Sequence, residues 1–174
     1  RILGLIQDEI EIAHQIAVGA LRYFLLKFTK NTVVVFDFKE ALSFEGETGV
    51  YCQYTAVRTN SIFRKLETGG LEAAIARVGA DPAGVAELFD SEIGHDIWSM
   101  ITLAARLEET IAQAVATSEP AILAKYCFSL AKAFNLFYHN HKILAEENAT
   151  KRAVLLLIAD MTRRALTSGL ATLG

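Results

Sequence analysis

Long stretches without a helix-breaking residue are the feature that most constrains this chain. Pro82 and Pro120 are the two prolines among 174 residues, and alanine, leucine, glutamate and lysine, which favour helices, are abundant. Apolar side chains recur every three or four positions, as they do on the buried face of a helix. Helices are predicted over residues 9–27, 48–66, 92–116, 120–140 and 149–168. Such helices bury their apolar faces against one another, so the sequence predicts an all-α helical bundle.

Shorter segments interrupt this pattern and predict where the helices begin and end. Residues 31–38 contain valines and phenylalanines that favour a short extended segment, an irregular lead-in to the bundle. Residues 43–49 carry two glycines and predict a loop. One or two short helices are expected over 71–90, with a break at 79–82. Side chains suited to a helix start or first turn are Asp8 with Glu11, Asp37, Pro120, and Asn148 or Thr150.

Composition limits the classes of protein to which the chain can belong. Apolar residues form 52% of the sequence and charged residues 21%, which is enough to build a core and excludes global disorder. The net charge of −3 disfavours nucleic-acid binding through bulk charge but leaves room for local basic patches. The apolar runs are shorter than the ~18 residues of a membrane-spanning helix. No membrane partner is therefore expected.

The cysteines and the missing motifs narrow the chemistry further. Cys52 and Cys127 are far apart in the sequence, so neither a zinc motif nor a disulfide framework is predicted, and reduced cytoplasmic thiols are the simpler interpretation. The sequence opens at Arg1 without methionine and shows no signal peptide, so we expect a piece of a longer protein. It contains no nucleophile elbow, P-loop or His-Glu-x-x-His motif. A self-contained enzyme is therefore poorly supported.

One face of the helix predicted at 48–66 combines aromatic rings with cations. Spacings of three and four place five side chains on one stripe: Tyr51, Tyr54, Arg58, Ser61 and Lys65. Unpaired nucleotides bind surfaces of this kind, because bases stack on the rings and cations meet the phosphates. The competing interpretation is that the tyrosines pack into the bundle and the cations form a solvated end.

Two later helices carry further polar faces. The helix at 120–140 and the residues that follow it present Lys132, Asn135, His139 and Lys142, bordered by Tyr138. The last helix carries Lys151, Arg152, Arg163 and Arg164, and Asp160 is spaced to form an i,i+4 ion pair with Arg164. An ordinary solvated surface is the competing interpretation for both helices.

A metal site is the alternative constellation. Glu11 with His14, and Glu92 with His95, each have the Glu-x-x-His spacing that di-iron helical bundles use. Gly94 beside His95 weakens the second pair, because metal ligands need a rigid helix face. No further glutamate stands out in the last two predicted helices. A di-iron bundle therefore remains an alternative that metal analysis would decide.

A detailed resemblance to a known family lies between Phe36 and Lys65. The segment reads FDFKEALSFEGETGVYCQYTAVRTNSIFRK. It closely resembles the arginyl-tRNA synthetase signature, which runs F-D-W, then L-S-F-E-G-x-T-G-P-Y-x-Q-Y-x-x-x-R, then S-I and R-K. Residues 16–26 resemble the segment that precedes this signature. Residues 130–140 and 152–174 resemble the C-terminal anticodon-binding, or DALR, domain of the family.

The resemblance implies a division of the chain and a function. Residues 1–47 would be the C-terminal tail of the catalytic domain or a connector, and residues 48–174 the helical anticodon-binding bundle. The implied partner is an arginine-accepting tRNA, bound by a monomeric cytoplasmic protein. The family's catalytic motifs lie upstream of such a segment. The implied activity, ATP-dependent arginine–tRNA ligation with Mg, therefore belongs to the parent enzyme, and this fragment is expected to be inactive and to hold no catalytic residue, cofactor or metal.

The family's anticodon contacts carry over to particular positions. Tyr54 and Tyr138 would stack on splayed bases, and Arg58 would hold a phosphate or a base edge. Further implied contacts are Tyr51, Asn135 and Arg152.

The chain departs from the family pattern in several places. Val50 stands where proline is usual, and Phe38 where tryptophan is usual. The family continues beyond the match to Gly174 into a short tail that ends in Glu-Arg-Met, which this sequence lacks. The alternative function is a stand-alone DALR-like helical module that binds a protein instead of RNA.

Overall fold

The computed structural model describes residues 2–174, with side chains described from residue 9 onward. Helices and connecting loops make up this whole range, and the described residues contain no strand. The helices are α1 (Ile2–Leu26), α2 (Phe38–Ala41), α3 (Gly49–Arg64), α4 (Gly70–Ala80), α5 (Pro82–Asp90), α6 (Gly94–Ala105), α7 (Leu107–Thr117), α8 (Ala121–Asn140) and α9 (Ala149–Leu173). The prediction of an all-α bundle is confirmed.

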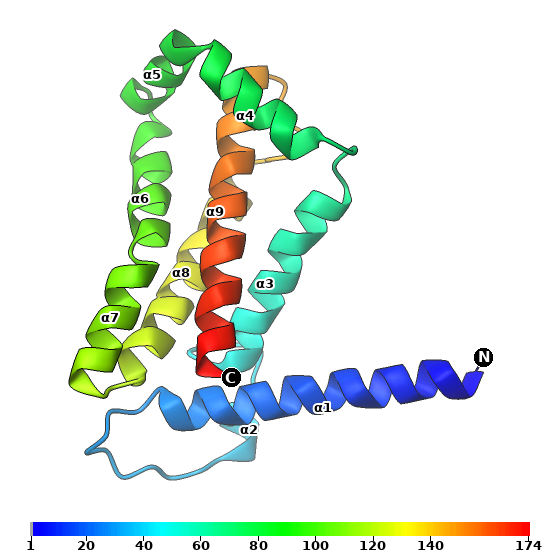
Figure 1. Cartoon of the computed structure of the whole chain (residues 1–174), viewed down its shortest axis with the longest axis vertical. Helices are drawn as coiled ribbons and strands as arrows, with labels where there is room; N and C mark the ends of the chain where they lie inside the picture. The colour runs from blue at the N-terminus through cyan, green and yellow to red at the C-terminus, as the bar shows by residue number, and fades with distance from the viewer. Residues whose placement is uncertain (1) are drawn as a thin grey trace.

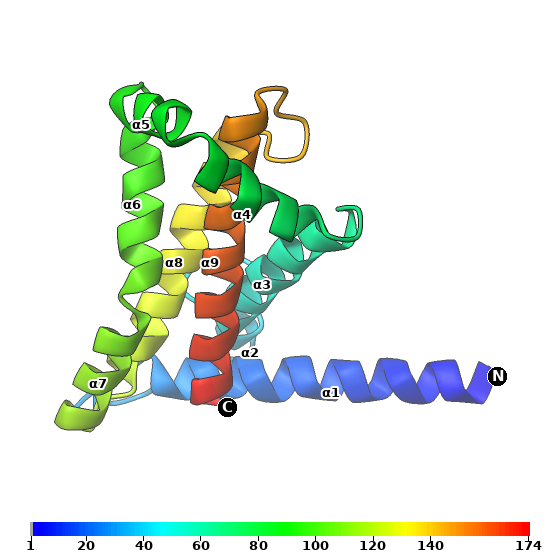
Figure 2. The same cartoon turned by 45° about the horizontal axis from the view of Figure 1, so that its top comes forward.

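Helix α9 is the central element of the bundle. It packs against α3, α4, α6 and α8, and α7 packs against α8. Helix α1 crosses one end of the bundle, beside the start of α3 and the end of α9, whereas α4 and α5 cover the opposite end (Figure 1, Figure 2). None of the helices in the described range is long and apolar enough to cross a membrane.

The core forms largely between α8 and α9, whose buried residues are mostly apolar. Its largest fully buried hydrophobic side chains are Phe24, Ile62, Ile97, Leu130, Phe134, Ile143, Leu155, Ile158 and Leu166. Burying a side chain of this size stabilises a fold by about 1.5–3 kcal/mol. Burial of these side chains therefore determines which faces of the helices pack against one another.

Helix α1 is fixed to the bundle by a few close contacts. Ala20, Tyr23 and Phe24 are buried, and the Tyr23 hydroxyl donates a hydrogen bond to the carbonyl oxygen of Ala124 in α8 (2.8 Å). Gly49 lies so close that a Cβ atom there would come within 2.8 Å of the Tyr23 Cβ atom. These contacts place the start of α3 directly against α1.

Side-chain caps confirm several predicted helix starts. The Asp37 carboxylate accepts hydrogen bonds from the backbone at the start of α2, and the Asn148 side chain does so at the start of α9 (2.9 Å). Thr150, the alternative cap for α9, is buried and donates instead to the carboxylate of Asp81 (2.5 Å). Pro120 immediately precedes α8, and Asp81 caps α5 where the break at 79–82 was predicted.

Three predicted boundaries are wrong. Helix α1 already begins at Ile2, so the start predicted near residue 9 is too late; the side chain of Asp8, its predicted cap, lies outside the described side chains. The helix predicted over 92–116 is two helices, which meet at Arg106. At this break the carbonyl oxygen of Ala104 accepts a hydrogen bond from the Tyr126 hydroxyl (3.1 Å), which offsets a lost helical bond. Helix α9 extends beyond 168 to Leu173.

Candidate nucleic-acid interface

An open groove between α3 and α8 brings together most of the predicted site residues. Tyr54 and Arg58 come from α3, one helical turn apart, and Asn135 and Tyr138 come from α8. The groove encloses about 510 Å³, lined by these four residues together with Val57, Ser61, Ile62, Lys65, His139 and Leu144. The two faces predicted separately thus form the two walls of one surface.

The guanidinium group of Arg58 is the centre of this groove. It donates hydrogen bonds to the side-chain oxygen of Asn135 (2.8 Å) and to the hydroxyl of Tyr54 (3.2 Å). Its central carbon lies 4.9 Å from the ring centroid of Tyr54 and 5.7 Å from that of Tyr138. A cation held close to two rings is attracted by both ring faces. The predicted union of rings and a guanidinium on one surface is therefore present.

The two main rings differ in how they are supported. The Tyr138 ring is stacked on the buried Phe134, with centroids 6.0 Å apart and planes inclined by 24°. Tyr54 is 51% exposed and has Arg58 beside it. One ring is thus backed by the core, and the other stands at the open edge with Arg58 beside it.

Tyr51 and Phe44 form a smaller hollow next to the groove. The ring of Tyr51 packs against Phe128 with centroids 5.5 Å apart, so it is partly a core residue, as the competing interpretation expected. It also lines a hollow of about 350 Å³ with Phe44, Tyr54, Arg58 and Asn135. Phe44 is 72% exposed in the loop before α3. Sequence reasoning missed Phe44, although an aromatic residue in a glycine-containing loop is a usable signal.

Arg152 is the one predicted site residue outside this cluster. It is exposed at the start of α9 and lines a separate groove of about 620 Å³ beneath α4. Lys65 and Leu144 line both grooves, so the two are neighbours. Arg152 is exposed, but the structure does not bring it to Arg58.

The remaining basic side chains of α9 have a structural explanation. Asp160 is buried, and its carboxylate accepts hydrogen bonds from Arg163 and from Arg164, the latter at 2.7 Å, which confirms the predicted ion pair. The guanidinium of Arg163 also lies 4.8 Å from the ring centroid of Phe63. Both cations thus pair with a carboxylate of their own helix, Arg163 also contacts α3, and neither lines the groove between α3 and α8.

The two Glu-x-x-His motifs do not converge. Glu11 and His14 lie on α1 at one end of the bundle, whereas Glu92 and His95 lie where α5 meets α6 at the other end (Figure 1). Within the described residues, no three histidine, cysteine, aspartate or glutamate side chains are close enough to share a metal ion. The di-iron hypothesis is therefore wrong for this arrangement of helices.

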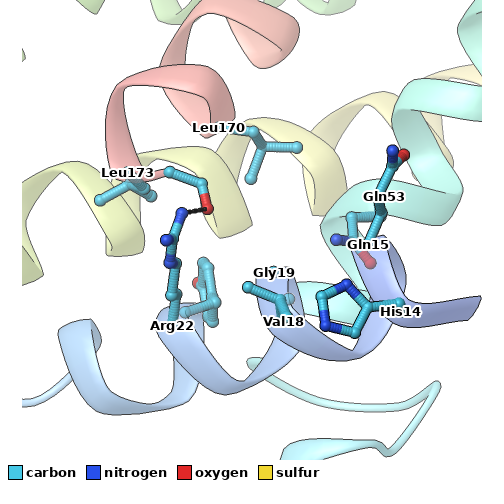
Figure 3. A pocket seen from close by; sticks show the side chains of 11 residues that line it. His14, Gln15, Val18, Gly19, Arg22, Gln53, Leu170 and Leu173 are labelled. Carbon is cyan, nitrogen blue, oxygen red and sulfur yellow. Dashed lines mark hydrogen bonds between the residues drawn. The ribbon is translucent and has the colours of Figure 1, made fainter. Parts of the chain in front are cut away.

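Another concave region lies away from the aromatic groove. Figure 3 shows it between α1, the start of α3 and the end of α9, lined by His14, Gln15, Val18, Arg22, Gln53, Leu170 and Leu173. It encloses about 430 Å³, and Arg22 closes one side by donating a hydrogen bond to the carbonyl oxygen of Gly174 (2.8 Å). It has neither the paired rings nor the central cation of the groove between α3 and α8.

Buried ionisable groups occupy the junction of α1, α3 and α8. Burial raises the pKa of Cys52 to about 12 and that of Cys127 to about 12. Burial likewise raises the pKa of Tyr23 far above its usual value. All three groups are therefore protonated near neutral pH and contribute to packing.

The bundle and its groove define the chain as a helical domain whose surface suits unpaired nucleotides. Comparison with known proteins gives the particular family. The chain belongs to the DALR anticodon binding domain family, which matches residues 52–174.

Individual relatives agree with this family. The chain is 34% identical over 98% of its length to an arginine–tRNA ligase of Bacteroides thetaiotaomicron, and 34% identical over 97% of its length to one of Pyrococcus furiosus. Among solved structures it resembles the Thermus thermophilus arginyl-tRNA synthetase, with a TM-score of 0.74 and 26% identity over 94% of the chain. It spans 27%, 26% and 26% of these three proteins, about a quarter of each. The resemblance seen in the signature at 36–65 is confirmed.

Proposed function

We propose that this chain recognises the anticodon loop of an arginine-accepting tRNA, as the anticodon-binding part of an arginine–tRNA ligase. The observation that carries the proposal is the guanidinium of Arg58, held close to the rings of Tyr54 and Tyr138 in an open groove. Membership in the DALR family and similarity to arginine–tRNA ligases support the same ligand.

The chemistry of the groove suits unpaired bases better than a duplex. A base has a flat face that stacks on an aromatic ring for about 1–3 kcal/mol, and in a duplex that face is already covered by its neighbours. The Tyr138 ring lines the groove and is backed by the buried ring of Phe134. Tyr54 and Arg58 lie beside it to stack on a second base or to hold a phosphate or base edge. Tyr51, Asn135 and Arg152 complete the proposed contact surface.

The proposal extends to the organisation of the parent protein. We infer that residues 48–174 are the anticodon-binding bundle and that residues 1–47 connect it to a catalytic domain. Most of the exposed large hydrophobic side chains lie before residue 48, and the family match begins at residue 52, which supports this boundary. In the full-length enzyme, which would be monomeric and cytoplasmic, arginine–tRNA ligation with ATP and Mg would take place in another part of the polypeptide.

Binding of a synthetic RNA hairpin tests the proposal. The probe is the anticodon stem-loop of an arginine-accepting tRNA, labelled for fluorescence anisotropy, and the matched control is the same stem as a closed duplex. Replacing Tyr54 or Tyr138 by alanine should weaken stem-loop binding by about 1–3 kcal/mol. Trp98→Ala is the control variant, because Trp98 is an exposed aromatic residue (59%) on α6, outside the groove.

The outcomes separate RNA recognition from the protein-binding alternative. Preference for the stem-loop over the duplex, lost with either tyrosine and kept with Trp98→Ala, supports anticodon recognition. Binding should also weaken with salt, with a log–log slope of about −0.7 for each phosphate neutralised on a single strand. If both tyrosine variants fold normally and bind the stem-loop as the parent chain does, the assignment of the groove is wrong.

A further inference from the structure

Thr55 follows Tyr54 in the sequence, but its side chain is turned into the contact between α3 and α8. Its side chain is fully buried (0% exposed). It does not line the groove, and no sequence pattern marked it as a binding residue. Its hydroxyl nevertheless meets the side chain of Asn135, which holds Arg58.

Hydrogen bonds lead from the buried backbone to the groove through these three side chains. The Thr55 hydroxyl donates to the carbonyl oxygen of Tyr51 (2.9 Å) and accepts from the Asn135 amide nitrogen (2.8 Å). The Asn135 amide oxygen then accepts from the guanidinium of Arg58 (2.8 Å). Every donor in this series therefore faces an acceptor.

The direction of this series fixes which end of the Asn135 amide faces the groove. If the amide were reversed, its NH₂ group would face the guanidinium of Arg58, and two donors would meet. Its oxygen would then face the Thr55 hydroxyl, whose proton is already donated to the helix backbone. Thr55 therefore favours the one amide orientation that offers an acceptor to Arg58.

We propose that Thr55 is a positioning residue that acts through Asn135 to hold the Arg58 guanidinium beside Tyr54 and Tyr138 for binding an unpaired nucleotide. The inference rests on the proposed function, because it concerns the same groove. Because its side chain is fully buried, Thr55 would not contact the RNA itself. Its contribution is to reduce the number of orientations that Asn135 and Arg58 sample before the ligand arrives.

Two substitutions separate the hydroxyl of Thr55 from its volume. Thr55→Val keeps the shape but removes the acceptor, whereas Thr55→Ser keeps the hydroxyl. Thr59→Val is the matched control on the same helix. Thr59 is also fully buried (0% exposed), but its hydroxyl donates to the carbonyl oxygen of Ala56 (2.7 Å) and takes no part in the series to Arg58.

The first measurement uses the 174-residue chain without RNA. In ¹⁵N-edited NMR spectra, Thr55→Val should shift the side-chain amide resonances of Asn135 and the guanidinium resonances of Arg58. Thr59→Val should leave both unchanged. If Thr55→Val leaves both sets of resonances unchanged, Thr55 does not position Asn135 and Arg58, whatever the chain binds.

The second measurement is the affinity for the anticodon stem-loop. Thr55→Val should weaken binding about fivefold, as expected for one lost hydrogen bond, and Thr55→Ser should stay within about twofold of the parent chain. Thr59→Val should bind as the parent chain does. On an Arg58→Gln background, Thr55→Val should have no further effect, because the guanidinium that Thr55 positions through Asn135 is gone.

The outcomes distinguish this inference from the proposed function. If the parent chain does not prefer the stem-loop, or Arg58→Gln does not weaken binding, the proposed function fails. If Arg58→Gln weakens binding but Thr55→Val does not, the function stands and the positioning role is overturned. The positioning role is also overturned if Thr55→Ser binds as poorly as Thr55→Val, or if Thr55→Val weakens the Arg58→Gln variant by the same factor as the parent.

Discussion

Gly49 starts α3 in such close contact with α1 that one added methyl group should be costly. A Cβ atom at this position would lie 2.8 Å from the Tyr23 Cβ atom and 3.0 Å from the Ala20 Cα atom. Neither neighbour moves easily. The Ala20 atom is helix backbone, and the ring of Tyr23 is held by the hydrogen bond from its hydroxyl to Ala124. Gly49→Ala must therefore push α1 away from α3.

The expected magnitude follows from the cost of overpacking a close contact. Forcing an extra methyl group into a packed interface costs about 1–3 kcal/mol, so Gly49→Ala should lower the free energy of unfolding by that amount. Gly79→Ala is the matched control, because Gly79 lies in α4 and a Cβ atom there would meet nothing within 4 Å. That substitution should leave stability unchanged or raise it by up to about 1 kcal/mol, since alanine favours helix more than glycine does.

Urea unfolding followed by circular dichroism measures both variants. The midpoint of Gly49→Ala should fall while the slope with denaturant is retained, and the midpoint of Gly79→Ala should hold or rise. If Gly49→Ala is as stable as the unmodified chain, α1 does not press on α3 at Gly49, and other contacts position α3. If Gly79→Ala is equally destabilised, the loss reflects glycine replacement in general and not the α1 contact.

Three further predictions concern the groove, acid stability and the buried thiols. Arg58→Lys keeps the positive charge but loses the planar guanidinium group with its several N–H donors. Stem-loop binding should therefore weaken about 5–30-fold in anisotropy titrations. Unchanged binding would refute a role for the guanidinium geometry. A hydrogen bond from Thr150 is the main cause that holds the pKa of Asp81 below its usual range. The ionised Asp81 carboxylate therefore stabilises the folded chain above about pH 4, and this contribution is lost as the pH falls through the lowered pKa. Asp81→Asn should therefore show a shallower acid decline of the unfolding free energy than the parent chain, and parallel declines would contradict this. Burial raises the pKa of Cys52 and Cys127 to about 12, so neither thiol should react with iodoacetamide at pH 8 until urea unfolds the chain. Mass spectrometry would measure the labelling. Rapid labelling of the folded chain would disprove the burial of the two thiols.

Sequence patterns predicted the local structure well where the signal is contained within a few residues. The caps at Asp37 and Asn148 follow from side chains that bond to backbone two or three positions later. The break at 79–82 follows from a proline that cannot continue a helix. By contrast, the break at Arg106 is not marked by any neighbouring residue. The carbonyl oxygen of Ala104 at this break accepts its hydrogen bond from Tyr126 of α8, which is distant in the sequence.

The site illustrates the same distinction. The stripe at Tyr54 and Arg58 follows from helical spacing within α3, and the face at Asn135 and Tyr138 follows from spacing within α8. Their union in one groove depends on how α3 and α8 pack, which joins residues 77 positions apart.

The sequence by itself therefore determined the helical class, most helix boundaries, the family signature and which side chains share a helix face. These properties depend on spacing and on side chains acting on nearby backbone. Only the tertiary structure decided that Arg58 meets Asn135, that Thr55 orients that amide from the buried side, and that Arg152 lies in a different groove. The physical reason is that packing between helices brings together residues that are far apart in the sequence. A pattern within one helix does not specify which residues of another helix it will contact.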